Sequence, residues 1–166
     1  LMDVERGEGK VLACCATVES EVTIEADIDV DPDFEGYPVE DYVATVTDIV
    51  DLSPTIKGLH LKLDRPMTFQ AGQYINIEVP GVEGARAFSL ANPPGKPDEV
   101  ELHIRLVEGG AATTYIHEQL KAGDELNLSG PYGQFFVRSS QPGDLIFIAG
   151  GSGLSSPQSM ILDLLE

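Results

Sequence analysis

Four consecutive residues, Arg86-Ala87-Phe88-Ser89, combine a cation, an aromatic ring and a hydroxyl in a segment that predicts a β-strand. In a strand, the side chains of Arg86 and Phe88 share one face, and those of Ala87 and Ser89 share the other. Such a set could hold a phosphate, a flat ring system and a ring nitrogen. Taken alone, these residues favour a simpler interpretation, an edge strand with an ordinary surface arginine.

Two glycine-containing segments are candidates for anion binding at a helix start. Residues 109–114 (GGAATT) place small side chains where a helix is expected, so the free N–H groups there have little steric cover. Residues 150–153 (GGSG) follow the apolar run 145–149 and precede a second helix, as in a nucleotide-binding α/β unit. A poorly capped helix and a plain strand-to-helix loop are the alternative interpretations.

The second glycine segment differs from the best-known nucleotide motifs. Ser156 stands where the dinucleotide fingerprint has its third glycine, and no lysine follows as in a P-loop. The segment also lacks the second flanking glycine of a hydrolase G-x-S-x-G turn. Ser155 and Ser156 are candidate N-caps of the following helix, and Pro157 fits its first turn.

The elements that would position these residues are mostly short strands. Alternating or β-branched apolar residues, separated by Pro and Gly, predict six strands at residues 42–52, 56–63, 73–79, 86–90, 99–107 and 125–128. A helix is expected over residues 111–121. Regular strand spacing of this kind predicts a small antiparallel barrel or sandwich. The continuous apolar run 145–149 predicts a strand buried on both faces of a parallel sheet.

Charge excludes several classes of function. The 166 residues include 28 Asp and Glu against 10 Lys and Arg, for a formal net charge of -18. This balance excludes nucleic-acid binding by phosphate neutralisation and disfavours docking on anionic membranes. No apolar run is long enough to span a membrane, and no signal peptide is recognisable, so we expect a soluble, cytoplasmic protein.

The N-terminal region has a different character from the predicted sheet. Residues 25–36 alternate acidic and apolar residues before Pro and Gly, which favours an extended, self-repelling linker, although a solvated acidic face is compatible. The chain begins at Leu1 and stops at Glu166 within an apolar helical pattern, so we expect a fragment of a longer protein. Cys14 and Cys15 are adjacent and do not predict a disulfide.

In their order along the chain, four motifs resemble those of the ferredoxin–NADP reductase superfamily. They are RAFS at 86–89, GGAAT at 109–113, GPYGQF at 130–135 and GGSGLSSP at 150–157. The likeness covers essentially the whole chain and is greatest to the reductase components of multicomponent phenol hydroxylases. It implies the C-terminal end of a 2Fe–2S ferredoxin domain at 1–28, an acidic linker at 29–38, a six-stranded Greek-key FAD-binding barrel at 39–140 and the start of an NAD-binding α/β domain at 141–166.

The resemblance also implies roles for particular residues. Arg86 would pair with the FAD pyrophosphate, and Ala87 is a further cofactor-binding residue. Phe88 stands where the family usually has Tyr, so packing on the flavin would remain while a hydroxyl contact is lost. Ser89, as the catalytic residue, would hydrogen-bond near flavin N5, where hydride arrives. The remaining cofactor-binding residues are Gly110, Ala111, Ala112 and Thr113 around the pyrophosphate, and Gly150, Gly151, Gly153 and Leu154 at the nicotinamide site.

Metal binding is implied only near the N-terminus. Cys14 would be the fourth ligand of the 2Fe–2S cluster and Cys15 a neighbour, but the C-x₄-C-x₂-C loop that supplies the other three ligands is absent from this sequence. The three histidines, His60, His103 and His117, have no ligand spacing, and we expect solvated side chains for all of them.

By resemblance, the parent protein takes hydride from NADH onto FAD and passes electrons singly through the 2Fe–2S cluster to a di-iron oxygenase that hydroxylates phenol-like aromatics. The fragment itself is expected to lack turnover. One alternative is the reductase of an aromatic-ring dioxygenase or another monooxygenase. Another is a flavin- or nucleotide-binding regulatory module without electron-transfer activity.

Overall fold

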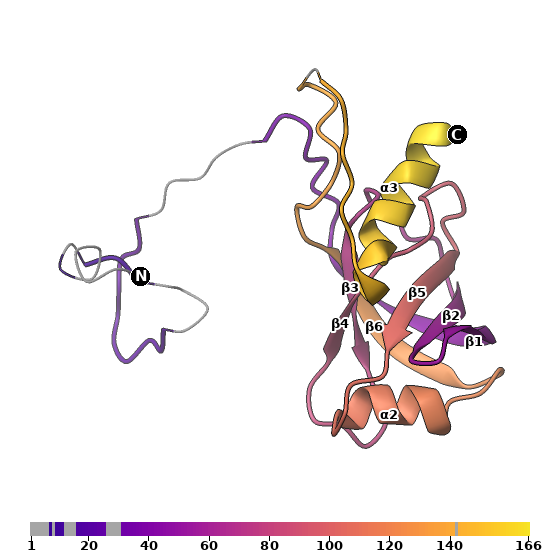
Figure 1. Ribbon diagram of the computed structural model, residues 1–166. Coiled ribbons are helices and arrows are strands. Elements are labelled where there is room, and N and C mark those ends of the chain that lie inside the picture. The colour runs from indigo at the N-terminus through magenta and orange to yellow at the C-terminus, as the bar shows by residue number, and fades with distance from the viewer. Residues whose placement is uncertain (1–6, 8, 12–15, 26–30, 142) are drawn as a thin grey trace. The chain divides into compact units, whose positions relative to one another are not determined.

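Residues 7, 9–11, 16–25, 31–141 and 143–166 are described by the computed structural model of the chain (Figure 1). The chain divides into two units, Leu1–Val30 and Asp31–Glu166, and the six strands all lie in the second. In the first unit, residues 16–25 are exposed and form neither helix nor strand. Cys14 and Cys15 lie outside the described residues, so the assignment of Cys14 as an iron ligand stays a prediction.

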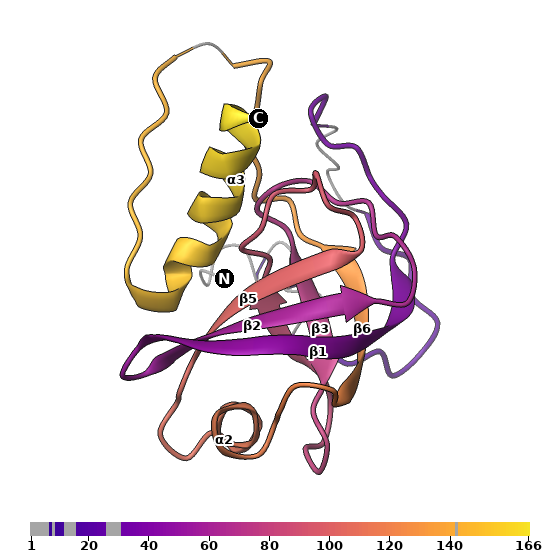
Figure 2. The same cartoon turned by 90° about the vertical axis from the view of Figure 1, so that its right-hand side faces the viewer.

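Six antiparallel strands form one sheet in the second unit, each where the sequence predicts a strand. They are β1 (Glu40–Ser53), β2 (Ile56–Leu63), β3 (Tyr74–Glu78), β4 (Arg86–Ser89), β5 (Glu99–Arg105) and β6 (Glu125–Tyr132). Their order across the sheet is β4-β3-β6-β1-β2-β5, with the long β1 pairing with both β6 and β2 (Figure 2). Strands distant in sequence therefore become neighbours around β6.

The alternation of apolar residues determines which side chains form the core. In β5, Val100, Leu102 and Ile104 are buried, whereas the residues at both ends of the strand are exposed. Helix α2 (Ala111–Glu118) lies across one end of the sheet and adds Ile116 to the same core (Figure 2). It ends earlier than predicted, because the N–H groups of Gln119 and Leu120 both donate to the carbonyl of Tyr115.

The sheet curls but does not close into the predicted barrel. Within the described chain, the edge strands β4 and β5 are joined at one isolated bridge, Leu90↔Leu102, and by a 2.8 Å hydrogen bond from Ala91 N–H to Glu101 O. The next residues, Asn92-Pro93-Pro94, include two prolines without N–H donors, which prevents a longer ladder. The six antiparallel strands are confirmed, but a continuous barrel is not observed.

The predicted strand at residues 145–149 is wrong for this structure. These residues form no strand, and the side chains of Ile146 and Ile148 are 84% and 92% exposed. A strand of a parallel sheet needs neighbouring strands on its edges, and none of the described residues pairs with this segment.

The chain then forms the 3₁₀ turn η2 (Gly151–Leu154) and helix α3 (Ser155–Leu165), as the helical pattern predicts. Helix α3 lies beside β5 and rises away from the end of the sheet that α2 covers (Figures 1 and 2). Among the described residues, no helix has the length and apolar character needed to cross a membrane.

Candidate functional site

Arg86 lies at the start of the edge strand β4, opposite Ile77 of β3, and is exposed. Its Nη1 donates to the carbonyls of Glu83, Gly84 and Ala85 at 3.2, 3.2 and 3.0 Å. These contacts hold the guanidinium against its own loop without neutralising it. Arg86 has no ion pair with any described residue, whereas several other bases pair with carboxylates, namely Lys57, Lys62, Arg65, Lys96 and Arg138. Its charge is therefore available to an anion.

The other residues of β4 differ in exposure. Ala87 is exposed, whereas Phe88 and Ser89 are half-buried, and Phe88 packs against the core. Ser89 lies opposite Tyr74 of β3, whose ring stacks on that of Tyr132 with 5.5 Å between centroids. In the part of the chain that the structure describes, the Ser89 hydroxyl has no hydrogen-bond partner. This end of β4 thus presents an uncommitted hydroxyl beside an aromatic ring.

The start of α2 is built from residues too small to cover its N–H groups. Gly110 is the N-cap residue, no side chain caps the helix, and its first turn contains no acid. A Cβ on Gly110 would lie 2.9 Å from Thr113 Oγ1 and 3.1 Å from the carbonyl oxygen of Val107, so a larger residue would not fit. These features leave the positive end of the helix dipole open to an anion.

Two of the predicted cofactor-binding residues on α2 have local structural roles. The Thr113 hydroxyl accepts from the Val107 N–H at 3.1 Å and lies 3.2 Å from the Gly110 carbonyl, to which it donates. Its side chain therefore shapes the turn. The side chain of Ala112 is buried in the core, so only its backbone could face a ligand.

A cavity of about 480 Å³ joins the start of α2 to the loop between β3 and β4. Its lining includes Pro80, Gly81 and Val82 from that loop and Gly109 and Ala111 from the helix start. Of the predicted pyrophosphate contacts, Ala111 lines this cavity, whereas Arg86 lies outside the lining and binds the carbonyls at the other end of the same loop.

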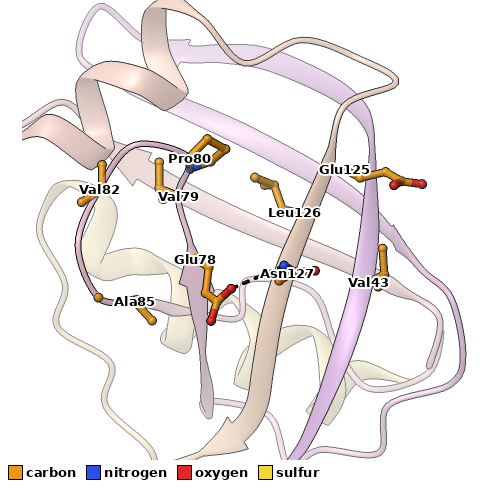
Figure 3. A pocket seen from close by; sticks show the side chains of 10 residues that line it. Val43, Glu78, Val79, Pro80, Val82, Ala85, Glu125, Leu126 and Asn127 are labelled. Atoms are coloured by element: carbon orange, nitrogen blue, oxygen red, sulfur yellow. Dashed lines mark hydrogen bonds between the residues drawn. The ribbon is translucent and has the colours of Figure 1, made fainter.

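A neighbouring cavity of about 560 Å³ lies over β3 and β6 (Figure 3). Val79, Val82 and Leu126 contribute apolar side chains to it, and Asn127 Nδ2 donates to Glu78 Oε2 at 3.4 Å. The predicted cofactor residues do not line this cavity. Its carboxylates also disfavour a phosphate, so the smaller cavity fits the predicted chemistry better.

The Gly150–Leu154 segment is exposed and sterically open. Gly151 has a φ of +57°, and a Cβ on Gly150 or Gly153 would have no atom within 4 Å outside the adjoining chain. Leu154 is 46% exposed. The four predicted nicotinamide-site residues are therefore together in one accessible turn.

The hydroxyls of Ser156 and Ser159 attach α3 to the sheet, and no serine caps the helix as predicted. Ser155 Oγ donates to Ser152 O at 2.8 Å, Ser156 Oγ to Gly72 O at 3.2 Å and Ser159 Oγ to Asn92 O at 2.6 Å. A cap would have to accept from a helix N–H, whereas these hydroxyls donate to carbonyls. Since Asn92 follows β4 closely, the docking brings α3 to the strand end that carries Ser89.

Sequence reasoning missed the glycine on which α3 docks. Gly72 has a φ of +101°, and a Cβ there would lie 2.2 Å from both Met160 Cε and the Phe135 carbonyl oxygen. The buried face of α3 contains serines beside Met160, where a typical amphipathic helix would be apolar. That small polar stripe is the signal in the sequence that could have indicated a hydrogen-bonded docking face.

The expectation of solvated histidines is wrong for His103. Its side chain is 7% exposed, and its Nε2 lies 2.8 Å from Glu101 Oε1, a contact that lowers the pKa of Glu101 against the effect of burial. His117 Nε2 lies 2.9 Å from the Ile104 carbonyl oxygen. In the described ranges, no cluster of three or more His, Cys, Asp or Glu could hold a metal.

The six-stranded antiparallel sheet is that of a flavin-binding oxidoreductase domain. The chain belongs to the oxidoreductase FAD-binding domain family, whose sequence profile matches residues 43–137. This match runs from β1 to just beyond β6 and thus includes β4 and the start of α2.

Two individual proteins match the whole chain with high sequence identity. The reductase component of phenol 2-monooxygenase of Pseudomonas sp. (strain CF600) is 75% identical, and the phenol hydroxylase P5 protein of Acinetobacter pittii (strain PHEA-2) is 69% identical, each over all of this chain. The chain spans 47% of the length of either relative. Among solved structures, the Amycolatopsis cytochrome P450 reductase GcoB is 34% identical with a TM-score of 0.71, over 75% of this chain and 38% of its own.

Proposed function

We propose that this chain is the flavin-binding part of an NADH-dependent reductase that supplies electrons to a phenol-hydroxylating oxygenase. The relatives named for phenol oxidation are 75% and 69% identical to it over its whole length. Since the chain spans about half of those relatives, NADH oxidation and electron delivery would be properties of the longer protein.

FAD, when bound, would accept hydride and release electrons one at a time. Arg86 would pair with its pyrophosphate, and the backbone N–H groups of Ala111 and Ala112 would face the same anion. Gly110 would leave room for this approach, and Thr113 would hold the loop in shape. The single observation that supports this proposal best is the charge of Arg86, which has no carboxylate partner among the described residues. Arg86 also binds carbonyls of the loop that shares a cavity with the start of α2.

At the other end of β4, Phe88 and Ala87 would line the flavin ring, and the Ser89 hydroxyl would hydrogen-bond near its N5. The turn formed by Gly150, Gly151, Gly153 and Leu154 would receive the nicotinamide. Its attachment through α3 to the residues that follow β4 supports this pairing, because hydride transfer requires the two rings to be held together.

Beyond the flavin, electrons would pass to a 2Fe–2S cluster with Cys14 as one ligand and then to a di-iron oxygenase. The net charge of -18 would speed association with a basic surface of that partner. The two alternatives share the flavin site and differ in where its electrons go. In one, the flavin passes them to another oxygenase system; in the other, the domain binds flavin but has no electron acceptor.

The test is the visible spectrum of the purified chain after reconstitution with FAD and removal of unbound flavin. We expect a bound flavin band in the unaltered chain. Arg86→Ala should weaken FAD binding about tenfold or more, since a charge-assisted contact to the pyrophosphate is lost. Lys121→Ala is the matched control, because it removes an exposed positive charge that has no ion pair among the described residues.

Equal FAD affinity in the Arg86→Ala and Lys121→Ala chains would refute the assignment of Arg86. A folded, unaltered chain that retains no FAD would overturn the proposed flavin site as a whole. In the longer protein, NADH should bleach the flavin band before an added acceptor is reduced. Bleaching without transfer to any acceptor would favour the binding-module alternative.

A further inference from the structure

The segment that leads into β1 is hydrogen-bonded to the segment that follows β6. Arg138 Nε donates to Asp31 Oδ2 at 2.7 Å. Asp33 accepts from the Ser139 hydroxyl at 3.0 Å, from the Ser140 N–H at 3.1 and 3.2 Å, and also from the Ser140 hydroxyl. Two segments separated by more than the whole sheet in sequence are thus joined by several charge-assisted hydrogen bonds.

Aromatic contacts reinforce this polar junction. The rings of Phe34 and Phe136 stack with 5.9 Å between centroids and 18° between planes, and the Arg138 guanidinium lies 4.8 Å from the Phe136 ring centre. We call the set Asp31, Asp33, Phe34, Phe136, Arg138, Ser139 and Ser140 the linker clasp. Phe136 is itself buried, so the clasp is anchored to the body of the sheet unit.

Gln70, in the loop between β2 and β3, fixes the entering segment a second time. Its Nε2 donates to the Asp33 carbonyl at 2.7 Å, and its Oε1 accepts from the Glu35 N–H at 3.0 Å. The stretch predicted to be an extended acidic linker therefore has a defined path from residue 31 onward. Repulsion from neighbouring acids was expected to keep Asp33 extended, but its carboxylate is held by donors from Ser139 and Ser140. The hydrogen bond from Ser140 lowers the pKa of this carboxyl.

We propose that the linker clasp sets the point at which the N-terminal unit is tethered to the flavin-binding sheet, so that Asp33 and Arg138 are positioning residues for electron transfer between the flavin and the N-terminal cluster. This inference rests on the proposed function. Residues 1–30 form a separate unit and continue directly into Asp31. With the clasp closed, the tether ends at residue 31.

With the clasp open, residues 31–39 would join the tether, which would then end at the start of β1 at Glu40. The effective concentration of a tethered group falls roughly as the −3/2 power of tether length, so the added residues would lower it. Opening the clasp should therefore slow any step that needs the N-terminal unit near the flavin. Reduction of the flavin by NADH needs no such approach and should be unaffected.

The experiment compares Asp33→Asn with Glu35→Gln in the full-length reductase that contains this chain. Both substitutions remove one negative charge from the same segment, but no described residue hydrogen-bonds or pairs with the Glu35 carboxylate. Three quantities are measured: the hydrogen exchange of the Ser140 amide, and, in a single turnover, the rates of flavin reduction and of flavin-to-cluster transfer. Hydrogen exchange reports the clasp without reference to activity.

In Asp33→Asn we expect the Ser140 amide to exchange about tenfold faster, because a charge-assisted hydrogen bond is weakened. Flavin reduction should be unchanged. Transfer to the cluster should be about twofold slower, less than full opening would cause, because Arg138 and Gln70 still hold the segment. Glu35→Gln should match the unaltered protein in all three measurements. The pair Asp31→Arg with Arg138→Asp should restore the transfer rate that either substitution alone lowers.

Faster Ser140 exchange with an unchanged transfer rate would overturn the positioning role. Unchanged exchange in Asp33→Asn would overturn the clasp itself. If NADH fails to reduce the flavin of the unaltered reductase, the proposed function is wrong and the electron-transfer role is lost with it. The exchange measurement would still report whether the clasp exists, so the two failures can be told apart.

Discussion

The segment after the sheet, residues 145–149, is more continuously apolar than strand β2, yet only the sheet buries its apolar side chains. Leu59 and Leu61 of β2 are almost fully buried, whereas Ile146 and Ile148 of the later segment are 84% and 92% exposed. The difference lies in the partners. Strands β1 and β2 are joined by the short turn at Pro54-Thr55, so each finds its neighbour locally. A parallel strand requires partners brought by long crossover connections.

Helix α3 shows that the later segment is still attached to the sheet, by other means. The sheet is held mainly by apolar burial, whereas the docking face of α3 includes, beside Met160, the donors Ser156, Gln158 and Ser159. Burial of apolar area stabilises roughly in proportion to that area, whereas a typical net hydrogen bond contributes only about 1 kcal/mol. We therefore expect the sheet to resist perturbation more strongly than the attachment of α3.

The largest contrast should come from the same substitution in the two regions. Ile75→Ala removes a fully buried side chain from β3 and should lower the free energy of unfolding by about 3 kcal/mol. Ile148→Ala removes a side chain that is 92% exposed and should change it by less than about 0.5 kcal/mol. Urea denaturation of both variants measures the difference. Similar losses would mean that residues 145–149 are packed in solution.

The second contrast concerns Gly72, where α3 meets the sheet unit. Gly72→Ala combines an unfavourable positive φ with contacts of 2.2 Å to Met160 and to the Phe135 carbonyl oxygen. Gly123→Ala is the control, since Gly123 has a φ of +93° but nothing within 4 Å of a Cβ. We expect a loss of about 1 kcal/mol at Gly123 and about 2 kcal/mol more at Gly72.

Hydrogen exchange would locate the effect of Gly72→Ala. Amides of α3 should exchange faster than in the unaltered chain, while those of β1 and β2 keep their protection. Equal stability losses at Gly72 and Gly123 would contradict the close approach of α3 at this position.

Much of this architecture could be predicted from the sequence because the sheet follows local rules. Alternation located all six strands, and only their ends moved. For example, β6 runs to Tyr132, beyond the predicted end at residue 128, because Tyr132 lies opposite Tyr74 of β3. The positions of Arg86 and Gly110 in a strand and at a helix start were predicted in the same way.

Contacts between distant segments could not be predicted by these rules. The acidic residues at 31–35 indicated a free linker, and nothing local indicates that Ser139 and Ser140 donate to Asp33. Likewise, the carbonyls that hold Arg86 and the serines that attach α3 depend on the tertiary path of the chain. Serine, arginine and aspartate are common at protein surfaces, so their types alone do not reveal these contacts, which depend on how the folded chain brings distant segments together.

The smallest expected effect lies where the two regions meet, at Glu101 of β5. Its Oε1 lies 2.8 Å from His103 Nε2 and accepts from Gln158 Nε2 of α3 at 3.4 Å. The hydrogen bond from His103 outweighs burial and lowers the pKa of Glu101 below its ordinary value of 4.5. The carboxylate therefore contributes stability above about pH 4.5, and this contribution is lost as the pH falls through the lowered pKa.

Glu101→Gln should remove this dependence, lowering the free energy of unfolding by about 1 kcal/mol or less at neutral pH and flattening its decline in acid. Glu99→Gln is the matched control on the same strand, since its ion pair with Lys96 is exposed. Denaturant unfolding between pH 3 and pH 7, about the range over which such a carboxyl titrates, measures both variants. Acid profiles of the same shape would mean that His103 does not stabilise the Glu101 carboxylate. A flattened profile with faster exchange in α3 would show that this carboxylate links the buried sheet to the helix docked on it.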